Sequence, residues 1–150
     1  MIFDRTQNDV DTALRLRSEK VQTFKELTES DITTLERGLL TINTLNRIES
    51  KQEELKGIFN EIGYWNTPIT NKQWSENEIF DVVDFQRIID NTNILRRAFF
   101  VYNDTPNTPN ISYHWRDINA LEKILYDLDI MINDVKRFYR ECNTFYCGEK

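Results

Sequence analysis

Residues 116–140 read RDINALEKILYDLDIMINDVKRFYR, and this stretch decides the fold class. Its apolar side chains recur at steps of three and four residues, which is the spacing along one face of an α-helix. They are Ile118, Leu121, Ile124, Leu125, Leu128, Ile132, Val135, Phe138 and Tyr139. The pattern predicts a long amphipathic helix over residues 116–140.

The same spacing predicts three further long helices, over residues 7–27, 41–62 and 84–100, the second with one polar gap at Gln52. No segment shows sustained period-two alternation, although residues 144–147 allow a short strand. We therefore expect an all-α bundle of about four main helices. A chain of 150 residues suits a single helical domain spanning 1–150.

Short polar residues and glycines predict where these helices begin and end. Thr6 and Asp84 are expected to cap two long helices, because their side chains accept hydrogen bonds from free N–H groups at a helix start. Ser30 is expected to cap a short helix that Gly38 interrupts. Gly63 directly follows an apolar stripe and is expected to end that helix in the left-handed conformation.

Two long connectors, one aromatic and one rich in Pro and Asn, are predicted over residues 64–83 and 102–112. Aromatic residues make up 12% of the chain, and several fall in or beside these connectors. Loop aromatics anchor protein interfaces, stack on sugar rings or cover the end of a bundle, and the sequence leaves all three roles open. The candidate binding residues are Tyr64, Trp65, Trp74, Tyr113 and Trp115.

One short pattern occurs twice, as LNRIE at residues 45–49 and as INALE at residues 118–122. Both copies place Asn and Glu three residues apart in the first turns of a long helix. One interpretation is a paired, pseudo-symmetric constellation that satisfies buried polar groups. The other is that Asn and Glu are simply common near helix starts. The residues concerned are Asn46, Glu49, Asn119 and Glu122.

Asp4 and Arg5 precede the first helix and extend this candidate polar motif. We expect Arg5 to pair with Glu49 or Glu122 across helix ends. The alternative is an exposed arginine, which contributes little to stability.

Composition excludes several classes of function. The chain has 25 acidic and 19 basic residues and a net charge of −6, which argues against binding nucleic acid or anionic lipid. Four glycines leave no room for a glycine-rich phosphate loop. One histidine and two cysteines argue against a metal cage, so we expect no metal and no cofactor.

The sequence offers no catalytic constellation. His114 has no Ser or Cys partner in a recognisable motif, and the acidic pairs fall on hydrated helix faces. We therefore predict no catalytic residues and no enzymatic activity. The first residues lack a secretory pattern, and no apolar run approaches the roughly 20 residues of a membrane span. These features predict a protein made in the cytoplasm, with free thiols at Cys142 and Cys147.

Several motifs then occur in a defined order along the chain. They are Phe3-Asp4-Arg5-Thr6-Gln7 with Asp9-Val10, Gly38, residues 45–49, Gly63-Tyr64, Trp74, Asn93-Ile94-Leu95-Arg96, Thr108-Pro109, residues 119–125 and the closing Phe145-Tyr146-Cys147-Gly148-Glu149. This ordered set resembles a helical module found in minor structural proteins of tailed phages and prophages of Gram-positive bacteria. Such proteins are usually tail-tip or baseplate components.

The resemblance implies a non-enzymatic virion part that works through protein–protein contacts, in several copies within a symmetric assembly. It places the protein in the virion tail, with other tail proteins as partners. A glycine-rich tyrosine stretch expected near Gly38 is reduced to residues 39–42. Two alternatives stay open, a carbohydrate-binding module for a host-surface glycan and an intracellular helical adaptor.

Overall fold

The computed structural model describes residues 1–23, 25–63, 68–110 and 114–142, with the side chains of 139–142 left out. Over these residues the chain forms five α-helices and no strand. They are α1 (Gln7–Thr23), α2 (Glu29–Gly38), α3 (Ile42–Glu61), α4 (Val82–Ala98) and α5 (Trp115–Cys142). The predicted all-α fold is confirmed. The strand considered at 144–147 lies outside the described residues.

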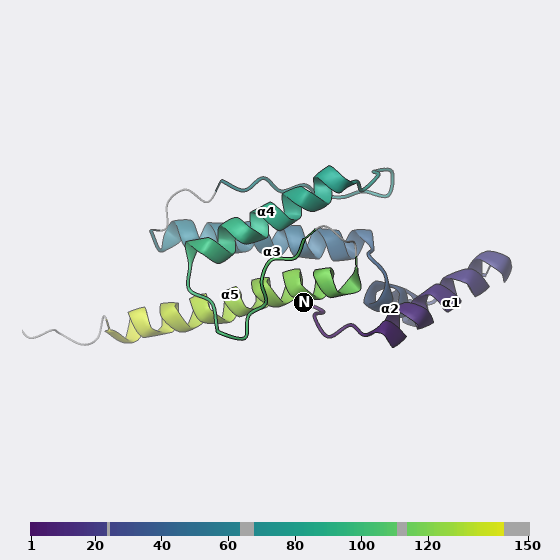
Figure 1. The fold of residues 1–150 in the computed structure, drawn as a ribbon, viewed down its shortest axis with the longest axis horizontal. Helices are drawn as coiled ribbons and strands as arrows, with labels where there is room; N and C mark the ends of the chain where they lie inside the picture. The colour runs from purple at the N-terminus through teal and green to yellow at the C-terminus, as the bar shows by residue number, and fades with distance from the viewer. Residues whose placement is uncertain (24, 64–67, 111–113, 143–150) are drawn as a thin grey trace, which may run out of the picture.

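The helices form two parts of unequal size (Figure 1). Helices α3, α4 and α5 pack against one another as a three-helix bundle, whereas α1 and α2 pack on each other as a hairpin that projects from one end of it. The second arm of the hairpin is α2, a helix of ten residues in the place where the sequence predicts a short helix.

The bundle core contains the apolar stripes that the sequence predicts. Its fully buried aliphatic and aromatic side chains include Ile48, Leu55, Phe59, Phe85, Ile88, Leu95, Leu121, Ile124, Leu125, Leu128 and Ile132. Gln52 fills the one polar gap in the stripe of α3. Its buried Nε2 donates to the carbonyl of Ile88 at 2.9 Å and to Oγ1 of Thr92 at 2.8 Å, so the amide joins α3 to α4.

The start of α1 agrees with the prediction, and the start of α2 does not. Oγ1 of Thr6 accepts a hydrogen bond from the backbone N–H of Asp9 at 3.3 Å, as expected of an N-cap. Helix α2 is capped by Thr28 rather than Ser30. Thr28 and Asp31 form a reciprocal capping box, which satisfies two free N–H groups at once and therefore outcompetes a single cap.

Helix α4 begins two residues earlier than predicted. Asp81, not Asp84, is its N-cap, and an oxygen of Asp81 accepts from the N–H of Asp84 at 2.9 Å. Asp84 then lies in the first turn, where its charge favours the positive end of the helix dipole. Helix α1 ends at Thr23 rather than residue 27. Gly63 has φ 87° after α3, as predicted for a left-handed ending.

The hairpin depends on one close approach of its two helices. A Cβ atom on Gly38 would lie 2.3 Å from the carbonyl oxygen of Asp9 and 2.4 Å from Cβ of Ala13. Ion pairs flank this contact, with Lys20 joined to Asp31 at 2.5 Å and Arg37 to Asp9 at 2.9 Å.

Several large apolar side chains of the hairpin are exposed. They are Leu14, Val21, Leu27 and Ile32. No described helix is both long enough and apolar enough to cross a membrane.

The two helical glycines predict opposite effects of the same substitution. Gly38→Ala forces a methyl group into the contact with Asp9 and Ala13, and we expect it to lower the free energy of unfolding by about 1–3 kcal/mol. Gly57→Ala meets no atom within 4 Å in the middle of α3. It is expected to raise that free energy by about 0.5–1 kcal/mol, because alanine favours the helix. Urea unfolding of both variants measures the difference, and equal effects would contradict the close approach.

The capping box of α2 predicts a dependence on acidity. Hydrogen bonds from Lys20 and from the backbone and side chain of Thr28 lower the pKa of Asp31 from 3.8 to about 2. Because the folded pKa lies below the unfolded one, the ionised carboxylate stabilises the hairpin above pH 4, and this stabilisation is lost as the pH falls from about 4 to about 2. A carboxyl NMR titration of Asp31 should give a midpoint near 2, and Asp31→Asn should remove this step from the acid unfolding curve. A midpoint near 3.8 would contradict the capping geometry.

Candidate functional site

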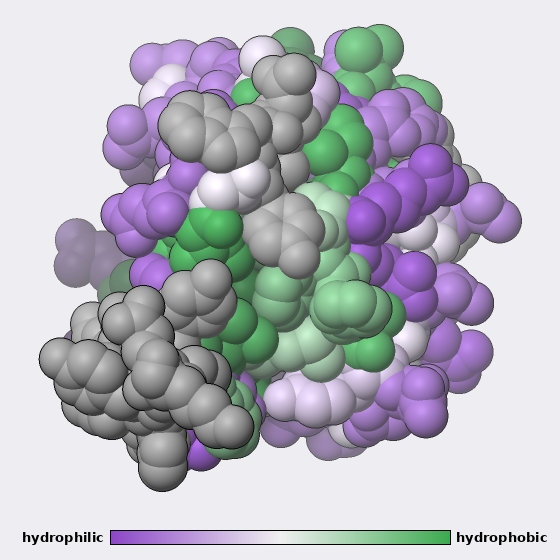
Figure 2. All heavy atoms as spheres, turned by 90° about the vertical axis from the view of Figure 1, so that its left-hand side faces the viewer, coloured by the Kyte–Doolittle hydropathy of each residue, from purple (hydrophilic) through white to green (hydrophobic). Residues whose placement is uncertain are grey.

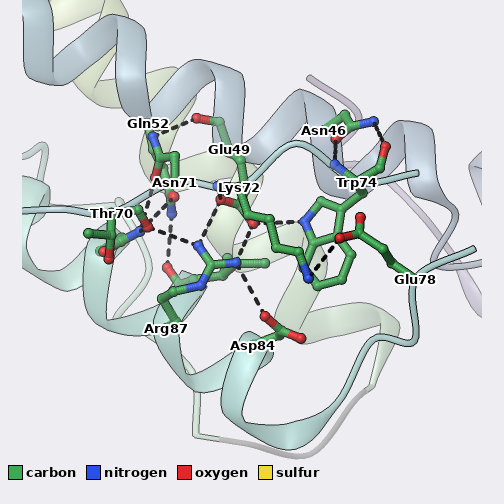
Figure 3. Close-up of polar contacts among 12 residues, drawn as sticks. Asn46, Glu49, Gln52, Thr70, Asn71, Lys72, Trp74, Glu78, Asp84 and Arg87 are labelled. Atoms are coloured by element: carbon green, nitrogen blue, oxygen red, sulfur yellow. Dashed lines mark hydrogen bonds and ion pairs between the residues drawn. The ribbon is translucent and has the colours of Figure 1, made fainter.

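The two Asn–Glu patterns organise the polar interior of the protein. In the first copy, the side chain of Asn46 binds both backbone groups of one residue in the connector before α4. Its Oδ1 accepts from the N–H of Trp74 at 2.7 Å, and its Nδ2 donates to the carbonyl of Trp74 at 3.0 Å. The segment 69–74 thereby runs alongside α3, from Lys56 back to Asn46 (Figure 3).

Glu49 lies one turn further along α3 and is only 1% exposed. Its carboxylate accepts from Nε1 of Trp74 at 2.8 Å and from the N–H of Lys72 at 2.5 Å. Both terminal nitrogens of Arg87 in α4 also donate to it, at 2.8 and 2.6 Å. This fork-like pairing with Glu49 raises the pKa of the Arg87 guanidinium above its ordinary value.

Further side chains satisfy the carbonyl groups of the same segment. Arg87 donates to the carbonyl of Thr70 at 2.9 Å, and Asn91 donates to it at 2.8 Å. Asn71 in turn donates to the carbonyl of Glu49 at 3.0 Å. The connector therefore forms part of the bundle although it has no regular secondary structure.

The second copy of the pattern holds the N-terminal segment against α5. Nδ2 of Asn119 donates to the carbonyl of Arg5 at 2.9 Å, and its Oδ1 accepts from Nη1 of Arg5 at 3.2 Å. Glu122 is completely buried. It accepts from Nη1 of Arg5 and, at 2.8 Å, from Nε of Arg47 in α3.

We call these two arrangements the Asn46–Glu49 clasp and the Asn119–Glu122 clasp. In each clasp the amide holds the backbone of an extended segment, and the carboxylate binds guanidinium groups. The two clasps follow the same plan. Helix α3 holds the segment that leads into α4, and α5 holds the segment that leads into α1. This is the paired constellation that the repeated pattern suggested, and Glu122 is the partner of Arg5. Asp4 lies apart from both clasps and pairs with Arg37 at 3.1 Å.

The aromatic candidates lie in different environments. Tyr64, Trp65 and Tyr113 fall outside the described residues. Trp74 is 4% exposed, its indole covered by Phe80 and by the ammonium of Lys72, 4.0 Å from the ring centre. It therefore presents no face to a ligand, and its prediction as a binding residue was wrong because Glu49 draws its N–H into the core.

Among the candidate aromatic residues that the structure describes, Trp115 is the one with part of its surface accessible. It is half-buried where the hairpin meets the bundle, and its Nε1 donates to Oε1 of Gln7 at 3.1 Å. A cavity of about 300 Å³ opens beside it. The lining residues are Arg5, Gln7, Val10, Gly38, Leu39, Leu40, His114, Trp115 and Ile118.

His114 has a structural role at this position. Its ring Nδ1 accepts from the backbone N–H of Arg116 at 3.2 Å, and its backbone N–H donates to the side chain of Asp117 at 3.1 Å. His114 therefore caps α5. Within the described ranges, no three His, Cys, Asp or Glu side chains are grouped to hold a metal ion. The buried charged side chains of this region are held in fixed ion pairs with one another.

The sequence did not predict Arg47 and Arg87 as partners of the buried glutamates. Nor did it predict that Glu49 binds the connector segment before α4. One signal was present, because Gln52, Asn91 and Thr92 are polar residues at inward-facing positions of α3 and α4. Buried polar side chains on facing helices indicate an interhelical network.

Comparisons with known proteins add no assignment. The chain matches no family model, no curated protein and no solved structure at a significant level.

The clasps predict that the same substitution at two glutamates of α3 lowers the free energy of unfolding by very different amounts. Glu49→Gln leaves Arg87 facing a neutral amide inside the bundle, and we expect the free energy of unfolding to fall by about 3 kcal/mol. Glu54→Gln removes the same charge from a largely exposed side chain, and we expect a change within about 0.5 kcal/mol. Denaturant unfolding of both variants tests this. Equal losses would mean that the buried pair contributes no more than a surface one.

Proposed function

We propose that this chain is a non-enzymatic structural or assembly protein of a phage or phage-like tail, in the tail tip, baseplate or adhesion apparatus. Its partners are other tail proteins, and it works through protein–protein contacts in a symmetric, multi-copy assembly. The ordered motifs of the sequence support the tail assignment. The observation that carries the contact role is the apolar surface of the projecting hairpin.

This surface is apolar and accessible. Val21 of α1 is 65% exposed and Ile32 of α2 is 44% exposed, with Leu14 and Leu27 exposed on the same hairpin. Large apolar side chains exposed on a projecting element favour a role for that element in contacts with other proteins. Arg37, bound to Asp4 and Asp9, ties α2 to the start of α1, so the surface is presented by a defined element.

A second apolar region lies at the opposite end of the bundle. Figure 2 views this end and shows hydrophobic side chains that reach the surface between hydrophilic ones. Helices α4 and α5 both end on this side of the bundle. Phe100, just after α4, and Phe138, late in α5, are both exposed. Two apolar regions at opposite ends of one molecule suit a subunit with a neighbour on each side. In such an assembly many weak contacts add up to firm attachment.

The proposal predicts that hairpin substitutions remove the protein from particles without unfolding it. We expect the double variant Val21→Asp and Ile32→Asp to keep its helical circular dichroism, because both side chains are exposed. Its amount in purified particles, measured by mass spectrometry, should fall at least tenfold. Ile79→Asp, at an exposed site outside the hairpin, is the matched control and should be incorporated normally.

Two results would contradict the proposal. One is that the unaltered protein is absent from purified particles while free protein is present in the lysate. The other is that the double variant enters particles as well as the control does, which would place the contact elsewhere.

A further inference from the structure

The cavity between the hairpin and the bundle differs in charge from the other hollows of the molecule. Its polar lining residues are Arg5, Gln7, His114 and Trp115, and no carboxylate lines it. Three other hollows on the described surface each contain acidic residues, with Glu49 and Glu53 in one, Glu54 and Asp129 in another, and Asp90 in the third. Basic residues line those three hollows too, so this cavity is the one of the four whose lining has a cationic side chain and no carboxylate.

A guanidinium at this cavity has unused capacity. Arg5 is 4% exposed, and its Nη2 has no hydrogen-bond partner among the described residues, although Nη1 binds Glu122, Asn119 and the carbonyl of Ile2. A buried N–H without a partner is costly, so such a donor favours a ligand that can accept from it.

The balance of charges around Arg5 also favours a ligand that carries a negative charge. Two guanidinium groups, those of Arg5 and Arg47, share the single carboxylate of Glu122, which leaves one positive charge in excess. The neighbouring acids have other partners. Asp4 and Asp9 bind Arg37, and Asp117 accepts from the N–H of His114.

The rim of the cavity adds donors, and its walls add apolar surface. Helices α1 and α5 both begin here, at Gln7 and Trp115, so the positive ends of two helix dipoles converge on one space. The Nδ1 of His114 is an acceptor, which leaves Nε2 to carry the proton and to donate. The apolar walls are formed by Val10, Leu39, Leu40 and Ile118.

We propose that this cavity binds an acidic peptide segment of a partner protein, through a carboxylate that sits next to an apolar side chain. The guanidinium of Arg5 would supply the positive charge that attracts the carboxylate, and the apolar side chain would pack against Leu39, Leu40 and Ile118. A free phosphate lacks the apolar part and a neutral sugar lacks the charge. The cavity volume of about 300 Å³ suits one or two side chains. The proposal rests on the proposed function, since it specifies the chemistry of the partner in the assembly.

The test uses two blocked tripeptides that differ only in charge, acetyl-Leu-Asp-Val-amide and acetyl-Leu-Asn-Val-amide. Each is titrated into the full chain, and the indole N–H signal of Trp115 is followed by nitrogen-15 NMR. The signal of Trp74, buried in the Asn46–Glu49 clasp, is the internal reference. We expect a saturable shift of Trp115 alone with the acidic peptide. The amide peptide should bind at least tenfold more weakly, a difference of about 1.4 kcal/mol.

A matched pair of variants locates the site. Leu40→Asp places a negative charge in the wall of the cavity at a partly exposed position, and it should weaken binding of the acidic peptide at least tenfold. Ile79→Asp adds the same charge far along the chain, at an exposed site outside the cavity, and should leave binding unchanged. Circular dichroism confirms that both variants are folded.

Any of three outcomes overturns the cavity proposal: no binding of either peptide, equal binding of both, or unchanged binding by Leu40→Asp. These outcomes are separate from a failure of the tail assignment. Peptide binding by a protein that never enters particles would keep the site and remove the assignment. Incorporation into particles without peptide binding would do the reverse.

Discussion

A buried carboxylate must be matched by a positive charge, and that requirement sets the arrangement of this protein. Glu49 and Glu122 are almost fully enclosed, where a charge without a partner carries a large desolvation cost. Arg87 reaches Glu49 from α4, while Arg47 and Arg5 reach Glu122 from α3 and from the first residues of the chain. Two charges thus connect three helices and two extended segments, and they admit one alignment of these elements.

How much the sequence predicts depends on the range of the interaction. Helical period is local, so the long helices of the bundle were predicted within a few residues. Helix starts were less certain where two candidate caps competed, as for Asp81 and Asp84. The repeated Asn–Glu pattern was visible, and Arg5 was expected to pair with one of its two glutamates. The other partners were not predicted, because Arg87 lies 38 residues from Glu49 and Arg47 lies 75 from Glu122. Nothing local distinguishes those arginines from surface ones.

Trp74 illustrates the same limit. A tryptophan in an irregular connector is typical of an exposed contact residue, and composition supports that interpretation. Its burial follows from Asn46, which binds its backbone, and from Glu49, which accepts from its indole N–H. The polar residues of α3 therefore decide where an apolar ring in another segment lies. The connectors carry specific structure here because helix side chains replace the hydrogen bonds of a regular element.

The two clasps also impose an order on folding during synthesis. Arg5 is synthesised more than a hundred residues before its partners Asn119 and Glu122. The α1–α2 hairpin relies on nearby contacts and can form early, whereas its attachment to the bundle must wait for α5. The beginning of the chain is thus among the last parts to be fixed. Closure of the segment before α1 onto α5 is then a late step of folding, and a nascent chain carries its projecting hairpin before it has the bundle that positions it.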